Sequence, residues 1–161
     1  MSSMMEATSS MDQGAQQGGV AQFPTQTRRI KRIGGRPITF DGSELGMAMS
    51  YSASVPYWYE INLYRTSDQR FVTTVRLFFI SDKEEDRVQG WDCGDLDEAI
   101  EKLIQYDAAR DVDLGMGLDP SKATPAELAA YAMDLRAQVA DRRQHYKSLV
   151  GEFLYELDGG Q

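Results

Sequence analysis

The stretch that decides the fold is residues 57–80, YWYEINLYRTSDQRFVTTVRLFFI. It contains two runs rich in aromatic and β-branched side chains, separated by the polar residues 66–70. Such runs are typical of β-strands, and a loop of this length can join two strands as a hairpin. Side-chain alternation assigns the more apolar face of the hairpin to the core, namely Tyr59, Ile61, Leu63, Val75, Leu77 and Phe79.

The opposite face of this hairpin is also partly apolar. It combines three aromatic side chains with polar ones, namely Trp58, Tyr64 and Phe78 with Asn62, Thr74 and Arg76. A half-buried sheet needs only one apolar face, so the second face requires its own explanation. One hypothesis is burial beneath a long helix or a second subunit, where aromatic side chains are enriched. The other is stacking on unpaired nucleic-acid bases.

Two further strands are predicted upstream of the hairpin. Asp41-Gly42 separates two β-like runs, and this dipeptide favours a two-residue turn, so we expect the fold to begin near Arg36. In the second run, one face between Gly46 and Ser54 consists only of small residues. Such a face either lets a helix approach closely or remains a flat surface in solvent. Downstream, residues 87–94 predict a short last strand.

Two helices are predicted after the strands. Asp95 followed by Glu98 resembles a capping box and begins a helix that we expect to cover one face of the sheet. Thr124 and Glu127 form a second capping box, with Pro at the first helical position. The intervening residues 109–123 are predicted to be loop.

The last helix carries a coiled-coil-like seam with alternating four- and three-residue spacing. The seam consists of Leu128, Ala132, Leu135, Val139, Arg142, Tyr146, Leu149 and Phe153. A straight helix of about 33 residues is about 50 Å long, whereas a compact body of this size is about 35 Å across. The helix should therefore either break near Gly151 or extend beyond its own domain. The predicted protein-interface residues are Trp58, Tyr64, Phe78, Leu128, Leu135, Val139, Tyr146, Leu149 and Phe153.

These elements predict an α+β fold in which an antiparallel meander of four to five strands precedes a covering helix and a long C-terminal helix. The expected organisation is a disordered tail with a basic arm at 1–35, sheet plus helix at 36–108, loop at 109–123 and long helix at 124–158. The order of strands followed by a helix resembles, in element order only, the Whirly type of single-stranded DNA-binding fold. That resemblance implies binding of unpaired DNA on the sheet.

Charge is distributed unevenly along the chain. Of its 17 basic and 25 acidic side chains, residues 28–37 hold five basic and no acidic ones, and residues 1–27 hold two acidic ones. The rest of the chain keeps 12 basic and 23 acidic side chains, so a basic arm precedes an acidic body. The candidate polyanion-binding residues are Arg28, Arg29, Lys31, Arg32, Arg36 and Arg76. The arm could equally serve as a tether or a subunit contact.

Catalytic chemistry finds little support in the sequence. Cys93 and His145 are the only thiol and imidazole, and nothing in the sequence pairs them as nucleophile and base. Asp111-x-Asp113-x-Gly115 weakly resembles a calcium loop, but Lys122 stands where a bidentate Glu is required. We therefore predict no enzyme activity, no metal and no cofactor.

The functional hypothesis is a non-enzymatic interaction or scaffold protein that forms a homo-oligomer and binds itself or another protein. Two alternatives remain open: single-stranded nucleic-acid binding by the basic arm and the aromatic sheet face, and mimicry of nucleic-acid charge by the acidic body toward a basic partner. No run of about 18 apolar residues is present, so no membrane association is expected. A single cysteine is compatible with the cytoplasm, which is the expected location.

Overall fold

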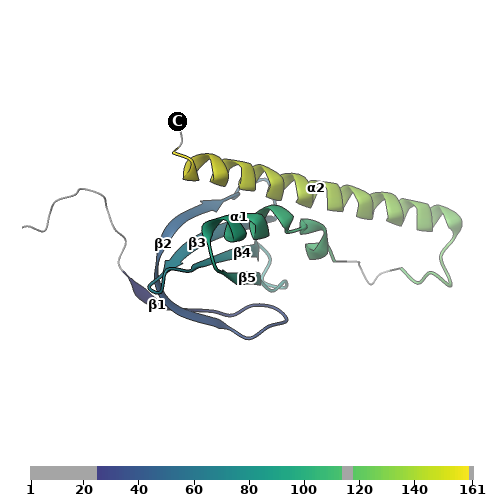
Figure 1. The fold of residues 1–161 in the computed structure, drawn as a ribbon. Helices are drawn as coiled ribbons and strands as arrows, with labels where there is room; N and C mark the ends of the chain where they lie inside the picture. The colour runs from purple at the N-terminus through teal and green to yellow at the C-terminus, as the bar shows by residue number, and fades with distance from the viewer. Residues whose placement is uncertain (1–24, 114–117, 160–161) are drawn as a thin grey trace, which may run out of the picture.

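The computed structural model describes residues 25–113 and 118–159. Five strands precede the helices (Figure 1). They are β1 (Gln26–Ile30), β2 (Ile38–Met49), β3 (Tyr57–Thr66), β4 (Phe71–Phe79) and β5 (Arg87–Cys93). Then come α1 (Leu96–Gln105), the 3₁₀ turn η2 (Ala108–Asp111) and α2 (Pro125–Leu157). The strands pair antiparallel in the order β1-β2-β3-β4-β5, which confirms the predicted α+β fold with a meander sheet.

The main core lies between the sheet and the two helices, which cover the same face (Figure 1). Helix α1 packs on β4 and β5, while α2 packs on β2 and β3. The predicted core face of the central hairpin is confirmed, because Tyr59, Ile61 and Leu63 are fully buried and Val75 and Leu77 nearly so. The last strand, predicted at residues 87–94, is confirmed by β5.

A second, smaller core fills the opposite face at one end of the sheet. It contains Ile30, Ile38, Phe40, Tyr64 and Val72. The β1–β2 connection folds across to β5, where the Ile33 amide donates to the Val88 carbonyl at 2.9 Å and Arg32 Nη1 donates to the Gly90 carbonyl at 3.0 Å. The sheet is therefore curled over this second core (Figure 1).

Two expectations about the first strands are wrong. The fold begins before Arg36, because residues 26–30 form β1, and Asp41-Gly42 is not a turn but lies inside the continuous strand β2. The connection between β1 and β2 instead contains Gly34, whose φ of 73° suits glycine. Tertiary pairing overrides the local turn preference, since Gly42 pairs with Gln26 on one side and Thr66 on the other. The predicted disorder of residues 1–27 falls mostly on residues outside the described ranges.

The run of small residues on β2 does allow close approach of a helix. A Cβ on Gly46 would lie 3.2 Å from the Phe153 ring of α2, so this glycine sets the distance between helix and sheet. Between Glu44 and Gly46 the pairing of β2 with β3 shifts register. Helix α2 continues without a break through Gly151, so the predicted long helix is confirmed and, of the two alternatives, the break near Gly151 is excluded.

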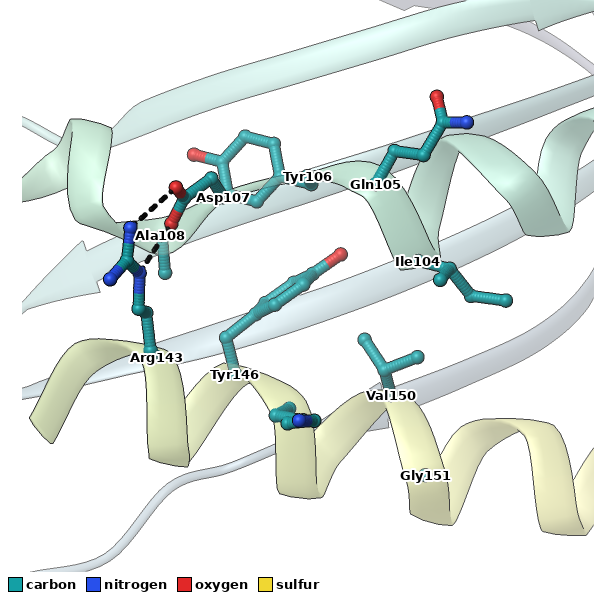
Figure 2. Close-up of a pocket in the computed structure, with 10 residues that line it drawn as sticks. Ile104, Gln105, Tyr106, Asp107, Ala108, Arg143, Tyr146, Val150 and Gly151 are labelled. Carbon is teal, nitrogen blue, oxygen red and sulfur yellow. Dashed lines mark hydrogen bonds and ion pairs between the residues drawn. The ribbon is translucent and has the colours of Figure 1, made fainter. Parts of the chain in front are cut away.

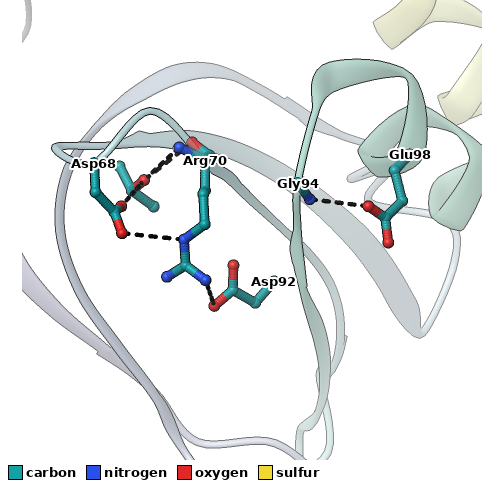
Figure 3. A network of polar contacts seen from close by, with 6 residues as sticks. Asp68, Arg70, Asp92, Gly94 and Glu98 are labelled. Atoms are coloured by element: carbon teal, nitrogen blue, oxygen red, sulfur yellow. Dashed lines mark hydrogen bonds and ion pairs between the residues drawn. The ribbon is translucent and has the colours of Figure 1, made fainter.

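Polar contacts fix the ends of the elements, as expected from the capping signals. The Asp95 carboxylate accepts from the Glu98 amide at 2.8 Å. Glu98 accepts in return from the Gly94 amide at 2.9 Å (Figure 3). Thr124 and Glu127 form the capping box of α2. Near the β3–β4 turn, Arg70 bridges Asp68 at 3.2 Å and Asp92 of β5 at 2.9 Å (Figure 3).

Candidate protein-interaction surfaces

Helix α2 consists of two halves with different surroundings. In the C-terminal half, the side chains of the seam are buried in the main core, namely Tyr146, Leu149, Val150 and Phe153. The interface prediction for Tyr146, Leu149 and Phe153 is therefore wrong, because these side chains pack within their own chain. The seam spacing alone could not tell a sheet of the same chain from a partner.

The point where α2 leaves the sheet is held by a cluster around Arg142. Its guanidinium carbon lies 4.0 Å from the centre of the Tyr57 ring and 5.6 Å from that of Phe79. Tyr57 donates its hydroxyl to Asp141 Oδ2 at 2.7 Å. The charged residue that interrupts the predicted seam thus contacts the ends of β3 and β4. The sequence signal for this cluster is the charged Arg142 at a position of the seam where an apolar side chain is expected.

Asp111, at the end of η2, connects three elements through a buried carboxylate. Its Oδ2 accepts from Tyr59 of β3 at 2.7 Å and from Tyr106 at the end of α1 at 2.6 Å. Its backbone carbonyl accepts from Arg142 Nη1 of α2 at 3.2 Å. Burial, together with the neighbouring carboxylate, raises the pKa of both tyrosines above the ordinary value. The structure places this residue, part of the faint calcium-loop pattern, in the core.

The N-terminal half of α2, residues 125–140, extends past the end of the sheet (Figure 1). We call it the overhang. Here the seam continues through Val139 and Leu135, which are half-buried, to Leu128, which is 39% exposed. The overhang is the one place where the predicted interface residues of α2 remain accessible. The buried seam of the helix therefore continues into solvent.

The second face of the sheet also keeps an accessible apolar area. Trp58 and Phe78 stack with ring centres 5.4 Å apart at 26°, and Tyr51 contacts Trp58 edge-on at 5.3 Å. Met47 and Met49, each 44% exposed, lie on the same face because they pair with Asn62 and Glu60. We call these five residues the sheet patch, namely Met47, Met49, Tyr51, Trp58 and Phe78. Of the two coverings considered for this face, the long helix and a second subunit, the helix is excluded, because α2 packs on the other face.

Tyr64, the third aromatic side chain predicted for this face, belongs to the second core and is buried. Between it and the sheet patch lies a polar network centred on Asn62. Asn62 Oδ1 accepts from Thr74 at 3.1 Å and from Arg76 at 3.1 Å, while Asn62 Nδ2 donates to Glu44 at 3.2 Å. The predicted aromatic surface is thus divided into a buried end and an accessible end.

The predicted polyanion-binding residues do not form one surface. The residues in question are Arg28, Arg29, Lys31, Arg32, Arg36 and Arg76. Arg28 lies over the Tyr64 ring at 4.8 Å, and Arg32 donates to backbone carbonyls, so both stabilise the fold. Arg29, Lys31 and Arg36 are exposed. Strand β1 contains Arg28 and Arg29 of the basic arm, and as successive residues of a strand they point to opposite faces.

Cys93 and His145 lie in different environments. The Cys93 thiol is buried, and burial, reinforced by nearby carboxylates, raises its pKa to about 11, so it is protonated at neutral pH. The His145 ring packs edge-on against Tyr57 at 5.5 Å, and its Nε2 lies 3.4 Å from Asp141 Oδ1. In the described part of the chain, no group of three or more His, Cys, Asp or Glu side chains is placed to hold a metal ion.

A cleft of about 550 Å³ lies between the end of α1 and α2 (Figure 2). Its walls include Ile104, Tyr146 and Val150, and Tyr146 donates to the Leu103 carbonyl at 2.6 Å. A two-point ion pair closes one end, with Arg143 Nε 2.9 Å from Asp107 Oδ1 and Nη2 2.8 Å from Oδ2 (Figure 2). This pair, which the sequence did not reveal, joins the loop after α1 to α2.

The Asp107–Arg143 pair predicts a small acid-sensitive contribution to stability. The Arg143 guanidinium lowers the pKa of Asp107 from 3.8 to about 2, so its stabilising effect is complete above about pH 4 and is lost between about pH 4 and 2. Asp107→Asn should lower the free energy of unfolding slightly at pH 7, because the pair is exposed. The difference in the free energy of unfolding between the parent and Asp107→Asn should disappear toward pH 2 in urea titrations. A difference that stays the same at every pH would contradict a contribution from this ion pair.

Among the helices that the structure describes, none has both the length and the apolar character needed to cross a membrane. Compared with protein-family models, with curated proteins and with solved structures, the chain matches none.

Proposed function

We propose that this chain is a non-enzymatic interaction protein that assembles with further copies of itself through the overhang of α2. The observation that carries this proposal is the continuity of one helix face. The same face that is buried against the sheet at Leu149 and Phe153 continues to Leu135 and Leu128, where the sheet no longer covers it. Exposed apolar surface of this kind is typical of an interaction site.

The energetics of the overhang support a binding role. Its 16 residues form about four turns and reach about 24 Å. A free helix of that length is only marginally stable in water, so the overhang depends on the packed half and on its capping box. A chain that needed α2 only for its own core could begin the helix near the Arg142 cluster. The overhang instead exposes the apolar seam to solvent. The seam residues of the overhang stabilise the protein only when a partner covers them.

A pair of matched variants tests self-association. Leu128→Glu with Leu135→Glu should weaken it at least tenfold, because two apolar contacts are replaced by charges. Ala130→Glu with Ala137→Glu adds the same charges to the opposite, exposed face of the overhang and should leave it unchanged. Sedimentation equilibrium over micromolar concentrations measures the dissociation constants. A monomeric parent protein would overturn the proposal, and equal behaviour of the two variants would exclude the seam.

Binding of unpaired nucleic acid is the second candidate function, favoured by the stacked and accessible Trp58 and Phe78. The support is weaker because Arg76, the cation on this face nearest to these rings in sequence, already donates to Asn62 and lies 3.9 Å from Glu60. Titration of the intrinsic tryptophan fluorescence with short oligonucleotides discriminates the two functions. Quenching at low salt that disappears in Trp58→Leu would favour nucleic acid over self-association.

A further inference from the structure

We propose that the overhang of one copy lies on the sheet patch of a second copy, and the reverse, so that two copies form a closed dimer with two equal contacts. This arrangement rests on the proposed self-association and specifies its geometry. It differs from simple pairing of two overhangs in a coiled coil. The overhang and the sheet patch would then cover each other.

By itself the overhang offers only a small surface for pairing with its own copy. A stripe about 24 Å long on a helix about 10 Å wide has a footprint of about 250 Å², whereas a stable interface covers about 800 Å² on each partner. Coiled coils are recognised from three to four heptads, and the overhang spans little more than two. Its seam also contains Ala132, which contributes little contact. Contact with a second surface would add to the area that the overhang alone can bury.

The dimensions of the sheet patch suit a helix. It spans the three neighbouring strands β2, β3 and β4, which at about 4.8 Å between strands makes it about 10 Å wide, close to the diameter of a helix. Along the chain it extends from Met47 of β2 to Tyr51, two residues past the end of that strand, or about 14 Å. Aromatic and methionine side chains are enriched in interface cores, and methionines adapt to irregular surfaces. Met133 of the overhang, 72% exposed, faces away from the seam and is not needed for this contact.

The two surfaces also lie at the same end of the domain. The overhang leaves the sheet at Arg142, whose guanidinium contacts the rings of Tyr57 and Phe79. The adjacent residues on those two strands, Trp58 and Phe78, point to the opposite face and form part of the sheet patch. A twofold axis just beyond this end would bring each overhang to the partner's sheet patch. Twofold symmetry then forms the contact twice and doubles its area.

A complementation experiment tests this geometry with the full chain. The first variant, Met47→Lys with Met49→Lys, disables the sheet patch through two exposed side chains. The second, Leu128→Glu with Leu135→Glu, disables the overhang. We expect each variant alone to be monomeric at concentrations where the parent is a dimer, with circular dichroism showing that both are folded. Their equimolar mixture should form a heterodimer, because the overhang of the first variant meets the intact patch of the second.

The outcomes separate the two proposals. A parent that stays monomeric overturns self-association itself. A patch variant that dimerises alone, while the helix variant does not, overturns only the arrangement and indicates pairing of two overhangs. If a patch variant does not fold, cysteine cross-linking replaces it: Leu135→Cys mixed with Met49→Cys should form a mixed disulfide between copies under mild oxidation. Cross-linking of Leu135→Cys only to itself would overturn the arrangement.

Discussion

Asp111→Ala should lower the free energy of unfolding by about 2–6 kcal/mol, because it leaves two buried hydroxyl donors without an acceptor at about 1–3 kcal/mol each. Tyr59 and Tyr106 donate to the same oxygen, Oδ2 of Asp111, and that residue is only 5% exposed. A loss of this size removes a large part of the stability that a domain has. Urea titration followed by circular dichroism measures it.

Two further variants separate the hydrogen bonds from the side-chain volume. Asp111→Asn keeps a carbonyl oxygen that can accept from both hydroxyls and loses only the charge, so it should be less destabilising than Asp111→Ala. Tyr106→Phe should destabilise the parent but have little effect in the Asp111→Ala background, where the hydroxyl already lacks its acceptor. Equal effects of Tyr106→Phe in both backgrounds would show that the carboxylate does not carry these bonds.

The same cluster links stability to alkaline pH. Burial raises the pKa of Tyr59, Tyr106 and Tyr146 above the unfolded value of 10, so each favours the folded state while protonated. Their contribution is therefore complete below about pH 10 and is lost as the pH rises further. The backbone carbonyl of Asp111 also accepts from Arg142, which follows the last residues of the overhang. Loss of the cluster should consequently weaken self-association as well as folding.

The fold could be predicted largely from the sequence because its signals are local. Alternation along residues 57–80 identified the buried face of the hairpin, and the capping boxes at Asp95 and Thr124 located both helices. The small side chains beside Gly46 indicated where a helix could approach, and Phe153 lies there. Each of these patterns depends on neighbours within a few positions, so tertiary structure did not alter their meaning.

The candidate surfaces were less predictable because they depend on contacts between distant segments. A seam residue such as Leu149 and one such as Leu128 have the same sequence signature, and only the length of the sheet decides which one is buried. Tyr64 and Trp58 lie on the same face of β3, but the β1–β2 segment covers only Tyr64. The role of Asp111 requires tyrosines that lie 52 and 5 positions away in the sequence. No local pattern brings such residues together.

Gly42→Ala should be the most damaging of three glycine substitutions, at about 2–3 kcal/mol, because a Cβ there would lie 2.4 Å from the Arg65 carbonyl oxygen. Backbone atoms of β3 cannot move aside as a flexible side chain can, so strands β2 and β3 would have to separate. Within β2, the Asp41 carbonyl accepts from the Ser67 amide at 2.7 Å, which keeps this part of the strand close to the β3–β4 turn. Gly42 therefore serves close approach rather than a turn.

The other two glycines are the controls, and the order of the three effects tests the strand assignment. Gly34 has open space around it but a φ of 73°, so Gly34→Ala should cost about 1 kcal/mol through backbone strain alone. Gly151 lies inside α2 with nothing within 4 Å of an added Cβ, so Gly151→Ala should stabilise by about 0.5–1 kcal/mol. If residues 41–42 formed a two-residue turn, Gly42→Ala would instead cost about as much as Gly34→Ala, because only backbone strain would oppose it. Urea titrations of the three variants decide between a continuous β2 and a turn.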